Sequence, residues 1–109
     1  MFLPWIIAFV FMNAVREELW FRATCLAEYG KYLGLNGANW VQAIIFTLAH
    51  SSPSLFKNPG FAAIYMGVII VLGLGFGATM QKSGSVLGAI LFHAGSDTPV
   101  ILAAFSLVI

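Results

Sequence analysis

The residues of this chain that could carry chemistry lie inside otherwise apolar stretches. A charged side chain within a membrane span is costly unless it is paired or faces a wet cavity, so it indicates a functional site by default. Carboxylates and imidazoles are also the groups that proteins use for general acid–base catalysis and for binding zinc. The residues in question are Arg16, Glu17, Glu18, Arg22, His50, His93 and Asp97.

The spacing within the first apolar stretch separates two roles. Glu18 and Arg22 are four residues apart and share a helix face, so they are expected to form an ion pair that positions the helix. Glu17 points about 100° away from Glu18. Its only nearby cation is Arg16, to which no chemistry is assigned beyond pairing with a carboxylate. Glu17 is therefore the carboxylate expected to be available as a general base.

The elements that must position these residues are predicted from composition. Hydrophobic residues make up 61% of the chain and charged residues only 8%, against about a quarter charged in an ordinary soluble domain. The 109 residues allow four crossings of about 20 residues each. We therefore predict an all-α, polytopic membrane helical bundle with about four transmembrane helices. The net charge of +1 is too small for a nucleic-acid interface.

Glycines and polar turns predict the ends and contacts of the helices. Gly30 and Gly34 are expected to mark the end of the first helix. The spacing of Gly73 and Gly77 is typical of closely packed membrane helices, and Gly84 with Gly88 is expected to repeat it on the last helix. The last helix is expected to bend near its Gly95 and Pro99. The predicted helices run from Pro4 to Glu28, from the Asn36–Asn39 turn to His50, from Phe61 to Gln81 and from Val86 to Ile109.

Alternating crossings predict the depth of each polar residue below one membrane face. At about 1.5 Å per residue, Glu17 lies roughly 17 Å deep and His50 roughly 18 Å deep. On the last helix, His93 lies roughly 14 Å and Asp97 roughly 20 Å deep. Side chains from three helices are therefore expected to meet near the middle of a hydrocarbon layer about 30 Å thick.

Three motifs in this order resemble those of a known family. Glu17–Arg22 matches EExxxR, Phe46–His50 matches FxxxH, and His93–Asp97 matches HxxxN or its Asp variant. On separate apolar helices they resemble the CPBP (Abi-like) intramembrane proteases, named for CaaX prenyl-protein and bacteriocin processing. The resemblance covers residues 1–109 as a single protease core domain. Many relatives have Asn at position 97 and carry further upstream helices, so a fragment or an unusually short member is expected.

The resemblance implies an intramembrane endopeptidase that cleaves a membrane-associated or prenylated protein or peptide. It implies that Glu17 and His50 activate a water, while His93 and Asp97 support the tetrahedral intermediate. Its catalytic set is Glu17, Glu18, Arg22, His50, His93 and Asp97. In a second version, Glu17, His50, His93 and Asp97 hold a divalent ion such as Zn²⁺; HExxH is missing, and both versions stay open.

Other classes of function remain alternatives. One is a non-enzymatic immunity or accessory protein that keeps the same fold and binds a partner. Another is an ion or proton transporter, which would need acidic residues along a path to both membrane faces, whereas here they gather at one depth. The expected partners are membrane lipid and a protein or peptide substrate, and the expected location is the cytoplasmic membrane of a prokaryote, which the protein crosses several times.

Overall fold

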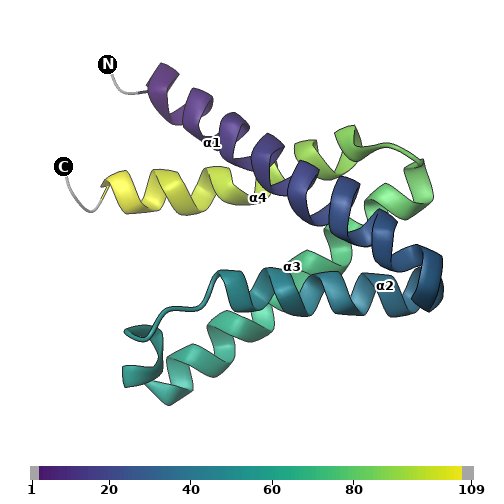
Figure 1. The fold of residues 1–109 in the computed structure, drawn as a ribbon. Helices are drawn as coiled ribbons and strands as arrows, with labels where there is room; N and C mark the ends of the chain where they lie inside the picture. The colour runs from purple at the N-terminus through teal and green to yellow at the C-terminus, as the bar shows by residue number, and fades with distance from the viewer. Residues whose placement is uncertain (1–2, 107–109) are drawn as a thin grey trace.

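The computed structural model describes residues 3–106, and within that range all regular elements are helical. The predicted all-α class is confirmed. Figure 1 shows α1 running beside α4, and α2 beside α3. The elements are α1 (Leu3–Glu18), a π-helical segment η1 (Leu19–Leu26), α2 (Ala27–Ala49), a 3₁₀ turn η2 (Leu55–Lys57), α3 (Pro59–Ser83) and α4 (Val86–Ser106).

The π-helical segment η1 follows the two adjacent glutamates directly and contacts α2, α3 and α4. Within it, the Thr24 hydroxyl donates to the carbonyl of Leu19, five residues earlier, at 3.0 Å. Segments of π-helix are rare and occur frequently at functional sites. The segment joins the two helix pairs and presents Arg22 to the interior.

The first helical run passes the predicted last residue, Glu28, and the helical Gly30, and ends at Gly34, the second of the two glycines expected to mark its end. The φ of +70° at Gly34 lies in the left-handed region, which favours glycine. The predicted Asn36–Asn39 turn is wrong, because the chain resumes helical structure directly after Gly34 and continues to Ala49. Backbone groups in an apolar environment must be hydrogen-bonded, so a one-residue break costs less than an open turn.

Both ends of α3 have local causes. The side chain of Asn58 accepts a hydrogen bond from the backbone N–H of Phe61 at 3.1 Å and caps the start of the helix. At the other end, Gly84 adopts a φ of +67° and donates its N–H to the carbonyl of Met80. Gly84 therefore terminates α3 and is not part of the last helix, which corrects the expected Gly84–Gly88 repeat. Gly88 alone packs closely there, against Thr79 of α3.

The last helix, α4, continues past Pro99 to Ser106. The predicted extension to Ile109 falls outside the described residues. Large apolar side chains are exposed along the helices, among them Trp5 at 76% and Val100 at 67%. Soluble monomers rarely expose apolar patches of more than a few hundred Å², so this surface indicates contact with lipid. Within residues 3–106, α3 and α4 are long and apolar enough to cross a membrane. The count of four crossings stays a prediction.

Candidate active site

The polar residues predicted to converge do lie together. Glu17 at the end of α1, His50 at the end of α2 and His93 on α4 share one point of contact, the Oε2 atom of Glu17. The Nε2 atom of His50 lies 3.5 Å from it, and the Nε2 atom of His93 lies 3.6 Å from it. The Asp97 Oδ2 atom lies 3.4 Å from His93 Nε2. Residues up to 80 positions apart in the chain thus form one cluster, here called the acid–imidazole cluster (Glu17, His50, His93 and Asp97).

The other nitrogen of each ring is held by a fixed acceptor. Nδ1 of His50 lies 2.7 Å from the carbonyl oxygen of Phe46, and Nδ1 of His93 lies 2.6 Å from Oε1 of Glu18. Because a carbonyl and a carboxylate accept hydrogen bonds, Nδ1 is the donor in both rings. In the neutral rings, both Nε2 lone pairs therefore face Glu17.

Glu18 and Arg22 form the predicted ion pair, with 3.0 Å between Arg22 Nη1 and Glu18 Oε1. Both side chains are fully buried, although the contact lacks hydrogen-bond geometry and Nη1 has no hydrogen-bond partner. The guanidinium instead lies over the ring of Phe46, 4.3 Å from its centroid, an arrangement that stabilises a cation. Glu18, paired with Arg22, thus holds His93 at Nδ1, the ring nitrogen that does not face Glu17.

Aromatic rings set the orientation of the imidazoles. His93 stacks on Phe76 of α3 with 4.6 Å between ring centroids and an interplanar angle of 11°. Phe46 lies edge-on to His93 at 5.9 Å and contacts His50 at 4.3 Å. These rings leave each imidazole few rotamers, so the direction of both Nε2 atoms is set by packing as well as by hydrogen bonds.

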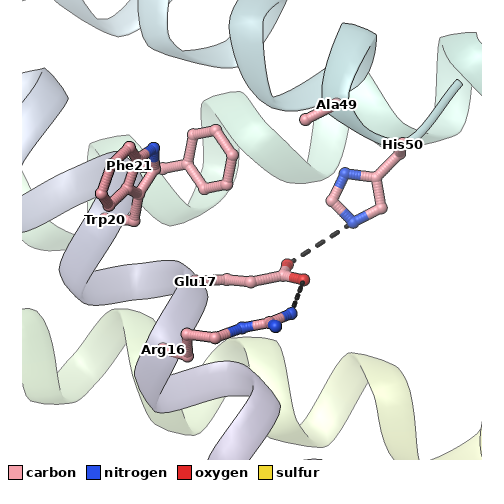
Figure 2. Close-up of a pocket in the computed structure, with 6 residues that line it drawn as sticks. All are labelled: Arg16, Glu17, Trp20, Phe21, Ala49 and His50. Carbon is pink, nitrogen blue, oxygen red and sulfur yellow. Dashed lines mark ion pairs between the residues drawn. The ribbon is translucent and has the colours of Figure 1, made fainter.

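A pocket of about 410 Å³ opens beside this cluster. Figure 2 shows Glu17 extending toward His50, with Arg16 on the other side of its carboxylate. Arg16 Nη2 lies 3.5 Å from Glu17 Oε1, and its side chain is largely exposed, so it pairs with a carboxylate as predicted. The pocket is lined by Arg16, Glu17, Trp20, Phe21, Ala49 and His50. A substrate chain in this pocket would lie against the cluster.

The sequence interpretation missed Asn13, which lies one helical turn before Glu17. Its Nδ2 group donates to Asp97 Oδ2 at 3.5 Å, and its Oδ1 atom accepts from Arg16 Nη2 at 3.0 Å. The available signal was its position: an amide four residues before Glu17 on an apolar helix shares that residue's face.

A second missed group joins α2 to α3. Asn39 Nδ2 donates to the carbonyl of Leu74 at 3.1 Å, and Gln42 Nε2 donates to the carbonyl of Gly73 at 2.8 Å. A Cβ atom on Gly77 would lie 1.9 Å from Asn39 Oδ1. Gly77 thus allows both amides to reach the backbone of α3. We call these five residues, Asn39, Gln42, Gly73, Leu74 and Gly77, the polar clamp.

The donor atoms of the acid–imidazole cluster determine whether a zinc ion suits it. Among residues 3–106, no three His, Cys, Asp or Glu side chains form a ready-made metal cluster. The two Nε2 atoms nevertheless lie 3.5 and 3.6 Å from one Glu17 oxygen, which is buried and has no hydrogen-bond partner. Ligand atoms around tetrahedral zinc stand about 3.3 Å apart for bonds of about 2.0 to 2.1 Å. The donor atoms are therefore of the types that bind a divalent ion, and both distances are somewhat longer than that spacing.

A helical membrane bundle that buries a carboxylate between two imidazoles has the features of a membrane-embedded hydrolase. The family model described as type II CAAX prenyl endopeptidase Rce1-like matches residues 1–98, and the chain belongs to this family. Membership makes it a peptidase that acts on protein or peptide substrates in a membrane context. Comparisons with curated proteins and with solved structures gave no match.

Proposed function

We propose that this chain is an intramembrane endopeptidase in which Glu17 acts as general base on the attacking water. The observation that carries the proposal is the convergence of two imidazole Nε2 atoms on the Oε2 atom of Glu17, at 3.5 and 3.6 Å. Three groups with lone pairs do not attract one another, so a proton or a bound polar molecule between them is favoured. A water there could give its proton to Glu17.

The remaining residues would position and stabilise. Glu18 holds Nδ1 of His93 and Phe46 holds Nδ1 of His50, so both rings keep their Nε2 atoms toward the reacting water. Once a ring takes up a proton, it can donate a hydrogen bond to the developing oxyanion, and such preorganised donors are worth most in a site that excludes water. Asp97, next to His93 Nε2, would stabilise that protonated ring.

The zinc version uses the same side chains. His50 and His93, with Glu17 or Asp97, would hold the ion. When bound, zinc would supply Lewis acidity and an activated water. Glu18 would then act on His93 as the carboxylate partner that orients a ligating imidazole. Chelation followed by addition of zinc separates the versions, because a metal-free glutamate protease would retain full activity through both steps.

The substrate proposed is the C-terminal part of a lipid-anchored, prenylated protein. The family description supports this class, and the pocket beside Glu17 is bordered by the apolar rings of Trp20 and Phe21, which suit an apolar chain. Transport is disfavoured by the placement of the acidic residues: Glu17, Glu18 and Asp97 lie together, and Glu28 pairs with Lys31 at 2.6 Å on the exposed surface. The three buried or half-buried acids form one group, and the four acids do not line a path across the protein.

The test uses the full chain in detergent micelles with internally quenched peptides ending in a CaaX sequence, in farnesylated and unmodified forms. E17Q should lower kcat about 10²- to 10⁴-fold, the usual contribution of a general base, with unchanged thermal unfolding. E28Q is the matched control and should match wild type, because the Glu28 side chain is exposed and pairs with Lys31. Cleavage by E17Q at the wild-type rate would remove Glu17 from the mechanism.

A further inference from the structure

The contact between α1 and α4 contains an amide–carboxylate pair with a defined direction. Asn13 Nδ2 donates to Asp97 Oδ2 at 3.5 Å, and Asn13 Oδ1 accepts from Arg16 Nη2 at 3.0 Å. The two partners assign the amide orientation, because a guanidinium only donates and a carboxylate only accepts. Asn13 therefore presents its N–H groups toward Asp97 and the active cluster.

Asp97 alone cannot supply a hydrogen-bond donor to the cluster. An ionised carboxylate has acceptors and no N–H donor, and its Oδ2 atom faces His93 Nε2 at 3.4 Å. Both of these atoms are acceptors when the ring is neutral. The amide of Asn13 adds a neutral donor next to them, and it lies on the same face of α1 as Glu17, one turn away.

We propose that Asn13 and Asp97 act as one unit across the α1–α4 contact, with Asn13 as the positioning residue that supplies the amide donor and holds Asp97 toward His93. The inference rests on the proposed endopeptidase function. It predicts that the cluster requires one amide and one carboxylate at these two positions, and that the two can be exchanged. Two carboxylates facing each other would repel and turn Asp97 away from His93.

The experiment compares N13D, D97N and the exchange variant N13D/D97N in the CaaX peptide assay, with thermal unfolding measured in parallel. N13D should lower kcat at least about 30-fold, within the range for losing a hydrogen bond to a charged group. The exchange variant should recover at least about tenfold over N13D, with KM changed less than about threefold. N36D is the matched control, since Asn36 is exposed on α2, and it should behave as wild type.

Specific results would overturn the inference. If the exchange variant is as slow as N13D while both remain folded, the two positions do not act as a unit. If N13A keeps kcat within about twofold of wild type, Asn13 positions nothing. If the wild-type protein shows no Glu17-dependent cleavage, the proposed function itself is refuted. In that case the coupling of Asn13 and Asp97 is still tested by stability: the unfolding free energies lost in N13D and D97N should not add up in the exchange variant.

Discussion

The acid–imidazole cluster and the polar clamp are both sets of polar side chains within an apolar helical protein. They differ in whether their polar atoms have hydrogen-bond partners. In the clamp, amide N–H groups of Asn39 and Gln42 end on backbone carbonyls at 3.1 and 2.8 Å. In the cluster, the nitrogen and oxygen atoms of Glu17, His50 and His93 face one another at 3.5 to 3.6 Å, and Glu17 Oε2 has no hydrogen-bond partner.

This difference suggests a packing role for the clamp and a chemical role for the cluster. Buried polar groups are normally hydrogen-bonded because an unpaired group keeps its desolvation cost. The clamp follows that rule for its donors, although Gln42 Oε1 lacks a partner, and it fixes α2 against α3. The cluster breaks this rule at Glu17 Oε2, the atom at which the proposed mechanism places the reacting water. Changes in the clamp should therefore affect folding, and changes in the cluster should affect activity.

The largest effect is expected from a side chain at Gly77. Leucine there would overlap Asn39 and Gln42, since even a Cβ would lie 1.9 Å from Asn39 Oδ1 and 2.7 Å from Gln42 Nε2. G77L should prevent assembly of α2 on α3, measured as loss of the folded fraction by tryptophan fluorescence in micelles. G67L is the control, because a Cβ at Gly67 meets nothing within 4 Å. A folded G77L protein would show that the clamp is dispensable.

Arg22 lies between the two regions: it pairs with Glu18, whose Oε1 atom accepts from His93 Nδ1 of the cluster, and its Nη2 group donates to the carbonyl of Gly73 at 3.4 Å. R22L should lower the free energy of unfolding by about 3 to 5 kcal/mol, because Glu18 is left buried without its cation. R16L should cost less than about 1 kcal/mol, as is usual for an exposed ion pair. Equal losses in the two variants would contradict the buried-pair assignment.

Replacing His50 tests the cluster without disturbing the core, since its side chain is one quarter exposed. H50Q should lower kcat by about 10² or more if the ring takes part in proton transfer. Its thermal unfolding should stay close to that of wild type. S52A in the neighbouring exposed turn serves as the control for the activity measurement. If H50Q lost stability but kept its activity, His50 would have a structural role and no role in catalysis.

A moderate effect on stability alone is expected for Gln42. Q42L removes two hydrogen bonds, to the carbonyl of Gly73 and to Asn39 Oδ1, and should cost about 1 to 3 kcal/mol of unfolding free energy, the net value of two hydrogen bonds. The kcat per folded molecule should be unchanged, because Gln42 contacts no member of the acid–imidazole cluster through its hydrogen bonds. Loss of kcat in the folded fraction would show that the clamp also positions the active residues.

Composition predicted the all-α class, helical spacing predicted the Glu18–Arg22 pair, and breaker residues predicted an end of the first helix at Gly30 and Gly34. The same reasoning placed Gly84 on the wrong helix, because a glycine at an interface and a glycine that ends a helix look alike in sequence. The predicted close packing at Gly73 and Gly77 is confirmed, but the sequence reasoning missed Asn13 and the clamp amides of Asn39 and Gln42. Their partners are a carboxylate 84 residues away and backbone carbonyls of α3, and backbone carbonyls leave no mark in the sequence.

By itself the sequence determined which residues could act and predicted that they lie at one level along their helices, because the identity of a side chain and its distance along a helix are local properties. It could not determine where the imidazole nitrogens point. The tertiary structure decided that Nδ1 of each ring is held by an acceptor and that both Nε2 atoms meet one oxygen of Glu17. The reason is physical: that direction depends on how three helices rotate and pack against one another, and no single helix contains it.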